Sequence, residues 1–443
     1  MKCSFWKVAW SLVIGIAITS ELALFAQTSA EQEYFIERIN HAHLENSLKP
    51  FEKTKKLSAR KVEKIKKQVW DNWVQTVHQI DTLPTLVSYK QESPTLHSWE
   101  MIDEDPMPFY WIEKVDGQEE DKRALFLNLH GSGPKDSELM ATLQWSKVYE
   151  DKPSVYFIPQ IPNEKRYRWW FKAEQYAWEK LFRLALVHPK IDANKMYVMG
   201  ISEGGYGSQR LGAFYGDYLA GAGPMAGGEP LENAPAYNYK YVPLSLQTGE
   251  LDGGFGRNTL TMRAKHVFDS LATHSDEGEY IHNIALQKGK GHGVDYTVTT
   301  PWLINFQRTT RPAHITWVNF PMDGRYRKAF YNVAILNELE VSPEDTMDRI
   351  VFDLRFDKSD NSVHLSALKT DAHLQDFKEL SKGSIALFLD DEYLDLSKEV
   401  RVYYKDEIVY QGKVKLDLKN IVESCALFGD PSRLFPAKVV VDL

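Results

Sequence analysis

Three side chains with the chemistry of nucleophilic catalysis occur along this chain in the order serine, acid, histidine. Ser202 is the middle residue of a Gly-x-Ser-x-Gly pattern at residues 200–204. A serine hydroxyl is a poor nucleophile at neutral pH, so it needs a base, and a carboxylate must orient that base. Asp252 and His292 follow in the order in which the acid and the base follow such a serine on a parallel sheet. We therefore predict Ser202 as nucleophile, Asp252 as acid and His292 as base.

The residues around Ser202 are those of a sharp turn from a buried strand into a helix. Met196–Met199 is an apolar run typical of a parallel strand that is buried on both faces, and small residues follow the serine. Gly200 and Gly204 are needed in such a turn because a Cβ there would collide with the neighbouring backbone. The alternative is a plain glycine-rich turn. The strand before the pattern and the helix after it favour the nucleophile.

The acid and the base each follow a candidate strand. Asp252 comes after the apolar run Val242–Leu246, with Glu250 as the rival carboxylate; we prefer Asp252 because it clears the strand end. His292 stands between two glycines after the run Ile284–Gln287. A flexible loop is the alternative interpretation of that histidine. Its third place after a serine and an acid favours the catalytic one.

Backbone N–H groups are the expected donors to the oxyanion of an acyl-transfer reaction. The segment His130–Gly133 follows the candidate strand Ala124–Leu129, and its glycines allow the backbone to approach a substrate closely. We predict the N–H of Gly131 or Ser132 as one donor. The N–H of Glu203, directly after the nucleophile, is the predicted second donor. A simple turn is the alternative for this segment.

Tryptophans lie in a loop before a predicted helix at Lys172–Val187. Trp169 and Trp170 are candidates for stacking on a sugar or phenolic ring of a substrate, and a hydrophobic anchor for the helix is the equal alternative. No cluster of His, Cys and carboxylates has metal-ligand spacing, and no phosphate-binding loop precedes a helix. We therefore expect neither a metal nor a cofactor.

The elements that must position these residues alternate between strand and helix. Between about residues 94 and 312, apolar strands without polar alternation predict an α/β fold with a mostly parallel sheet and helices on both faces. Residues 31–93 form an N-terminal helical extension. Its apolar stripe on a helix from about Ser58 to Ile80, with Ser58 as N-cap, is interpreted as core packing rather than a binding surface.

Beyond Pro312 the periodicity changes to that of half-buried strands. Apolar and polar residues alternate over Ile350–Phe356, over Val400–Tyr404 and over Val414–Leu418, with Asp406-Glu407 as a hairpin turn between the last two runs. This pattern predicts a separate antiparallel β domain over residues 313–443, built as a sandwich. It contains no candidate catalytic residue.

Composition limits the class of protein and of partner. A chain of 443 residues is too long for one ordinary core, so two or three domains are expected. Its 43% hydrophobic and 26% charged residues are ordinary for a globular protein. A net charge of −8 argues against nucleic acid or an anionic membrane as partner.

Residues 1–30 have the pattern of a signal peptide. A basic start precedes the short apolar run Val8–Ile18, and sites for signal peptidase end at Ala26 and at Ala30. An uncleaved membrane anchor is the alternative, but Glu21 interrupts the apolar run before it reaches about 20 residues. We expect a secreted or periplasmic protein without a membrane span after cleavage. Its one remaining cysteine, Cys425, can form no internal disulfide.

Residues 124–306 resemble the α/β-hydrolase superfamily. The likeness lies in the His-Gly loop at 130–133, the elbow at 200–205, the Gly-x-x-Asp loop at 249–252 and the Gly-His-Gly loop at 291–293. It is closest to a secreted bacterial branch with feruloyl- and acetylxylan-type esterases, polyhydroxybutyrate depolymerase-like proteins and prolyl-oligopeptidase-like peptidases. The resemblance implies Ser202, Asp252 and His292 as the triad. The glycine-rich continuation at residues 253–258 departs from the pattern.

Three functions follow from these observations. The first is a secreted serine esterase of carboxylic esters, either small molecules or esters linked to polysaccharide, that works through an acyl-enzyme. The second is a prolyl-oligopeptidase-like serine peptidase, since the same triad serves both, although no propeller repeats precede the catalytic segment. The third, from another class, is a non-catalytic glycan-binding protein built on a hydrolase fold. The complete set of triad residues argues against the third.

Overall fold

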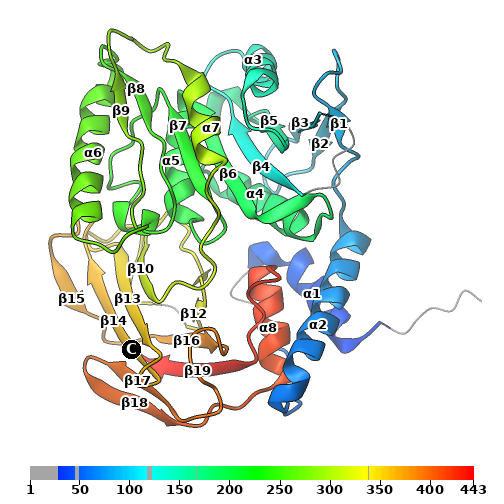
Figure 1. The fold of residues 1–443 in the computed structure, drawn as a ribbon, viewed down its shortest axis with the longest axis vertical. Helices are drawn as coiled ribbons and strands as arrows, with labels where there is room; N and C mark the ends of the chain where they lie inside the picture. Colours follow the sequence, from blue (N-terminus) through cyan, green and yellow to red (C-terminus); the bar gives the residue numbers. More distant parts are fainter. Residues whose placement is uncertain (1–27, 45–48, 117–121, 167, 338) are drawn as a thin grey trace, which may run out of the picture.

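A computed structural model describes residues 28–44, 49–116, 122–166, 168–337 and 339–443. The predicted class is confirmed: a large, mostly parallel sheet with helices on both sides is joined to N-terminal helices and to a C-terminal β part (Figure 1). The predicted signal peptide lies outside the described residues up to residue 27, and its cleavage stays a prediction. Within the described ranges, no helix is both long and apolar enough to cross a bilayer.

The central sheet has nine strands in the order β1-β3-β5-β4-β6-β7-β8-β9, with β2 paired to β3. From β5 to β9 all neighbours are parallel. The strands are β1 (Val87–Ser88), β2 (Leu96–Trp99), β3 (Met107–Lys114), β4 (Arg123–Leu129), β5 (Ser154–Pro159), β6 (Ile191–Ile201), β7 (Gly221–Met225), β8 (Gln247–Gly249) and β9 (Ala285–Gln287).

Both faces of this sheet are covered because its central strands are apolar on both. In β4, Phe126 packs in one core and Leu125 and Leu127 pack in the other, as the alternation of a strand requires. The first core is shared with α3 (Lys135–Val148) and α7 (Thr299–Leu303). The second is shared with three further helices, α4 (Lys172–Val187), α5 (Glu203–Phe214) and α6 (Arg257–Thr273).

One predicted strand of this sheet is displaced. The run Val242–Leu246 was expected to be the strand before the acid, but only Leu244 makes isolated bridges there, and the strand is β8, directly after it. Pro243 has no N–H to donate to a ladder, so regular pairing begins only beyond it. The acid loop still follows a strand end.

The N-terminal extension consists of α1 (Ala30–Asn40) and α2 (Ala59–Ile80). The Ser29 side chain caps α1, whereas Ser58 precedes α2 without a side-chain cap. The core-packing interpretation of the α2 stripe is confirmed, because Val69 and Trp73 are buried. They pack beside α8 (Leu418–Phe428), which lies next to both N-terminal helices in Figure 1.

The C-terminal part is two sheets around one core. The first has the order β10-β13-β14-β17-β18 with β15 on β14, and the second has the order β11-β12-β16-β19. All pairs are antiparallel except β14 with β17. The strands are β10 (His314–Asn319), β11 (Ala329–Phe330), β12 (Val333–Ile335), β13 (Arg349–Asp357), β14 (Ser362–Thr370), β15 (Phe377–Glu379), β16 (Ser384–Leu389), β17 (Val400–Tyr404), β18 (Glu407–Gly412) and β19 (Ala437–Asp442).

The prediction of a strand over Val414–Leu418 is wrong. The partner of β17 is β18, directly after the turn, and Leu418 begins α8. Asp417 is the N-cap of that helix, and its side chain accepts a hydrogen bond from the Lys419 N–H at 2.9 Å. The apolar residues at 418, 421, 422 and 425 have helical spacing, and they carry α8 onto the N-terminal helices rather than into a sheet.

Candidate active site

The site lies at the carboxyl edge of the central sheet. The segment His130–Gly133 follows β4, Ser202 follows β6, Asp252 follows β8 and His292 follows β9. These strands are parallel, so their carboxyl ends meet at one edge. Residues as far apart in sequence as His130 and His292 are brought to the same edge by this topology.

Ser202 occupies a strained turn between β6 and α5. Its φ of 56° and ψ of −112° lie outside the regions that most residues adopt. Two close approaches impose the turn: a Cβ at Gly204 would lie 2.1 Å from the carbonyl oxygen of Leu129, and one at Gly200 would lie 2.6 Å from the same atom. The Ser202 N–H donates to Met225 O at 2.8 Å. The hydroxyl is thereby fixed beyond the strand end.

A chain of hydrogen bonds connects the three predicted side chains. Ser202 Oγ lies 3.0 Å from His292 Nε2, and His292 Nδ1 lies 2.8 Å from Asp252 Oδ2. In the tautomer with the proton on Nδ1, the ring donates to the carboxylate and accepts from the hydroxyl. The rival Glu250 lies elsewhere, accepting from the Gly289 N–H at 2.8 Å. The geometry required of a nucleophile, a base and an orienting acid is present.

Arg257 is a member of the site that the sequence did not reveal. Its Nε donates to Asp252 Oδ2 at 2.8 Å and its Nη2 donates to Asp252 Oδ1 at 2.6 Å. Asp252 Oδ2 therefore accepts from Arg257 and from His292 together. Burial alone would raise the pKa of Asp252, but the hydrogen bonds from Arg257 and His292 outweigh burial and lower it. The acid is held ionised and in one orientation.

The glycine-rich continuation after the acid explains how Arg257 returns to it. Phe255 and Gly256 have positive φ values of 52° and 70°, which reverse the chain so that α6 begins at Arg257. A Cβ at Gly254 would lie 2.6 Å from Arg257 Nη2, so a glycine makes room for the guanidinium. Asp252 and Arg257 are separated by four residues, three of which are glycines. This spacing of an acid and an arginine is the signal that could have identified the pair.

His130 holds the loop that follows β4. Its side chain is fully buried; Nδ1 donates to Gly131 O at 2.7 Å, and Nε2 accepts from the Ile161 N–H at 3.0 Å. Burial lowers the pKa of His130 to about 4, so the ring is neutral at neutral pH. His130 therefore fixes the position of the loop beside Ser202.

The three predicted oxyanion donors are placed differently. Gly131 lies next to Ser202, since a Cβ there would be 3.4 Å from Ser202 Cβ, and its backbone also faces the carboxylate of Glu138. Glu203 is the first residue of α5, so its N–H has no acceptor within the helix. Ser132 is exposed on the loop. Glu138, which sequence reasoning missed, braces this loop from α3.

The two tryptophans for which a stacking role was considered are both buried. Trp169 is fully buried and donates from Nε1 to His130 O at 3.0 Å. Trp170 is 8% exposed, with the guanidinium of Arg210 3.9 Å from its ring centroid. Neither ring face is open to a substrate. The alternative of an anchor for the following helix fits both residues.

The mouth of the site is open and amphipathic. The His292 side chain is 46% exposed, and Phe255, at 89%, is exposed on the loop after the acid. Arg168 forms an ion pair with Glu203 at 3.2 Å, next to the nucleophile. Burial raises the pKa of Glu203 despite that partner. His292 is therefore accessible from outside the protein.

Comparisons with known proteins give likeness of fold over about half of the chain. A thermostable esterase has a TM-score of 0.34 and 19% identity over 48% of this chain and 63% of its own. A ferulic acid esterase from Anaeromyces mucronatus has a TM-score of 0.34 and 15% identity, over 50% of this chain and 94% of its own. A dipeptidyl aminopeptidase IV-like protein from Bacteroides ovatus has a TM-score of 0.33 and 12% identity, over 48% of this chain and 34% of its own. No family model and no curated protein matches. The geometry of the site therefore carries the assignment below.

We expect Arg257→Gln to lower kcat/KM about 10- to 100-fold, because an acid held by one donor instead of two lets the base drift from its productive position. The matched control is Arg263→Gln, which removes an exposed arginine of the same helix from its pair with Glu232. Steady-state kinetics on p-nitrophenyl acetate and circular dichroism check both variants. Equal activity of the two variants would show that Arg257 is dispensable.

We expect His130 to make the fold sensitive to acid. Its folded pKa of about 4 lies below the usual value of 6.5, so the unfolded chain binds the extra proton more readily. The contribution of neutral His130 to the free energy of unfolding is complete above about pH 6.5. It is lost as the pH falls toward 4, and the loss is on the order of 3 kcal/mol. Urea unfolding between pH 4.5 and 7 should show a smaller slope with pH for His130→Asn than for the wild type. Parallel slopes would contradict this account.

Proposed function

We propose that this protein is a secreted serine hydrolase of carboxylic esters, of α/β-hydrolase type. The observation that carries the proposal is the unbroken path from the Ser202 hydroxyl through His292 to a carboxylate, at the carboxyl edge of a parallel sheet. Each link is within hydrogen-bond distance before any substrate is bound. The N-terminal sequence pattern supports the secreted location.

The geometry supports an acyl-enzyme mechanism. Ser202 Oγ attacks the ester carbonyl carbon while His292 Nε2 takes the hydroxyl proton. The tetrahedral oxyanion collapses, the bond to the alcohol oxygen breaks, and the imidazolium returns that proton to the leaving alcohol. A water molecule, deprotonated by His292, then attacks the acyl-enzyme and restores Ser202. Asp252, kept ionised by Arg257, stabilises the imidazolium in both halves.

The oxyanion is assigned to the N–H groups of Glu203 and Ser132. The Glu203 N–H is at the positive end of α5, and it is free of an intrahelical acceptor. Gly131 lies beside Ser202, with its backbone facing the carboxylate of Glu138. A donor of this kind is worth about 10²–10³ in kcat in related chemistry.

An ester is preferred to a peptide as substrate on chemical and sequence grounds. An alkoxide leaves more readily than an amine, so an ester makes the smaller demand on proton transfer by His292. The resemblance of the sequence to secreted feruloyl- and acetylxylan-type esterases supports the same choice. The open mouth suits an ester on a polysaccharide. A glycan-binding role without catalysis would leave the hydrogen-bonded triad unexplained.

A fluorophosphonate probe should label the mature protein once, at Ser202, because its hydroxyl lies 3.0 Å from a histidine ring that is itself oriented by a carboxylate. Ser202→Ala should abolish labelling, and Ser208→Ala, which removes a buried hydroxyl from the same helix, should retain it. Mass spectrometry of the labelled peptide identifies the site.

The substrate class is tested with p-nitrophenyl acetate, methyl ferulate and a prolyl p-nitroanilide. We expect turnover of the esters to exceed that of the anilide by several orders of magnitude. Labelling at another residue in an active preparation would overturn the assignment of Ser202 as the nucleophile. Efficient cleavage of the anilide alone would make the protein a peptidase.

A further inference from the structure

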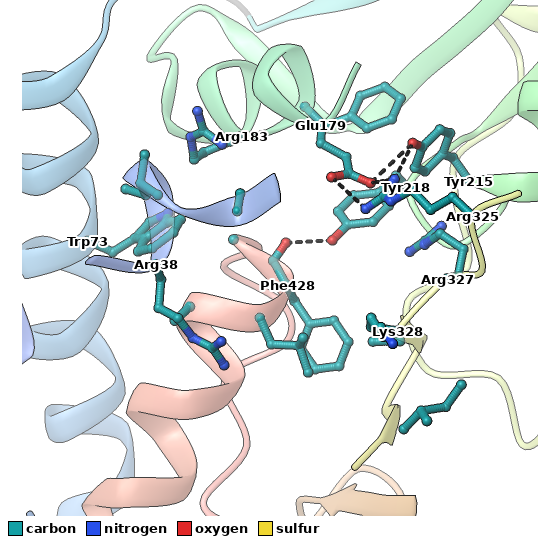
Figure 2. Close-up of a pocket in the computed structure, with 18 of the residues that line it drawn as sticks. Arg38, Trp73, Glu179, Arg183, Tyr215, Tyr218, Arg325, Arg327, Lys328 and Phe428 are labelled. Atoms are coloured by element: carbon teal, nitrogen blue, oxygen red, sulfur yellow. Dashed lines mark hydrogen bonds and ion pairs between the residues drawn. The ribbon is translucent and has the colours of Figure 1, made fainter. Parts of the chain in front are cut away.

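A second cavity lies far from Ser202, where the three parts of the chain meet. It has a volume of about 530 Å³, within the range of small-molecule sites. Figure 2 shows side chains from α1, α4, α8 and the segment after β10 around it. We call it the junction cavity and define it by Arg38, Arg183, Arg325, Arg327 and Lys328, its five cationic lining residues.

The junction cavity is separated from the triad by the length of α5. Ser202 precedes the first residue of that helix, and Tyr215, which lines the cavity, caps its other end. A helix of 12 residues is about 18 Å long, so one ligand of ordinary size cannot occupy both places. The cavity is therefore not an extension of the proposed active site.

Positive charge exceeds negative charge around this cavity, although the chain as a whole carries −8. Among the described residues that line it, Glu179 is the one carboxylate, and Arg325 donates to its two oxygens at 2.6 and 3.1 Å. Arg327 pairs with Asp217 at 3.1 Å, but Asp217 also accepts a hydrogen bond from Arg433. Two of the five cations are therefore committed to carboxylates.

The other three have no such partner among the described residues. Arg38 donates to the Tyr34 hydroxyl at 3.1 Å, and Lys328 has no ion pair in the described part of the chain. Arg183 Nε is buried without a hydrogen-bond partner there. Burial lowers the pKa of Arg183, which means that its charge is held at a cost in free energy. An unpaired buried cation is destabilising unless an anion joins it.

Most of the other lining residues are apolar or aromatic, with Asn337 as a polar exception. Phe182, Leu427 and Phe428 line the cavity, and the Tyr218 hydroxyl is already satisfied by Phe428 O at 2.8 Å. A fully hydrated inorganic ion would leave this wall uncovered. An apolar body joined to an acidic group would cover both kinds of surface.

We propose that the junction cavity is a binding site for a small organic anion, in which the cationic lining attracts a carboxylate or phosphate and an apolar body lies against α8. The cationic side chains come from α1, from α4 and from the segment after β10. The ligand therefore joins the N-terminal helices, the central sheet and the C-terminal part. Its binding does not depend on the chemistry proposed for Ser202.

Isothermal titration and thermal unfolding of the full mature protein test this site, with benzoate, phenyl phosphate and inorganic phosphate as anions and benzyl alcohol as the neutral counterpart. We expect an aromatic anion to bind with an affinity that falls as salt rises and to raise the unfolding midpoint by several degrees. Benzyl alcohol should bind at least tenfold more weakly. Comparison of benzoate with phenyl phosphate identifies the acidic group.

Two variants and two controls locate the binding. Lys328→Gln and Arg38→Gln should each weaken binding about tenfold, and neither has an ion pair to lose in the described structure. Lys382→Gln, at an exposed position of the C-terminal part, should not weaken it. Ser202→Ala should bind as the wild type does, which separates this site from the proposed active site. The proposal is overturned if no anion binds at millimolar concentration, or if binding is unchanged in both cavity variants or lost in Ser202→Ala.

Discussion

The contact on which the site depends is the close approach of the start of α5 to the end of β4. It leaves no room for a side chain at Gly200 or Gly204, and it forces Ser202 to a φ of 56°. A backbone in this region costs on the order of 1–3 kcal/mol, and it persists because the buried sheet on both sides fixes the turn. The strain has a chemical result: the hydroxyl stands clear of the sheet, within 3.0 Å of a histidine. The roles that we propose for the base and for the oxyanion donors both depend on this placement.

The remaining parts of the site keep neighbouring groups in one protonation state and one orientation. Arg257 and His292 together keep Asp252 ionised, and burial keeps His130 neutral. Glu138 braces the loop beside the nucleophile from α3. Buried carboxylates are also paired with arginines away from the site: Asp217 and Asp430 form ion pairs with Arg308, Arg327 and Arg433. These buried pairs connect the central sheet to the C-terminal part, so the two are linked by charge as well as by packing.

Sequence predicted best what local geometry controls. The elbow is a short pattern with a fixed spacing of its glycines, although the backbone that they clear belongs to Leu129. The helix Lys172–Val187 has both its spacing and its bounds in the sequence. Arg257 was not predicted as a member of the site because a glycine-rich loop, and not a periodic element, returns it to Asp252. The burial of Trp169 depends on its contact with His130, 39 residues away. The helix α8 was missed because Val414, Leu416 and Leu418 alternate like a strand, whereas the helical spacing begins only at Leu418. The junction cavity draws on segments that are far apart in the chain, and it has no local signature.

The central claim is that the Ser202 oxygen becomes covalently acylated during turnover. Rapid mixing with p-nitrophenyl acetate, followed by acid quenching and mass spectrometry of peptides, tests it directly. The account predicts a burst of p-nitrophenol close to one equivalent per protein molecule if deacylation is the slower step, and an acetyl group on the peptide that contains Ser202 in the quenched sample. An acetyl group on any other residue of an active preparation, or turnover that persists undiminished in Ser202→Ala, would contradict it.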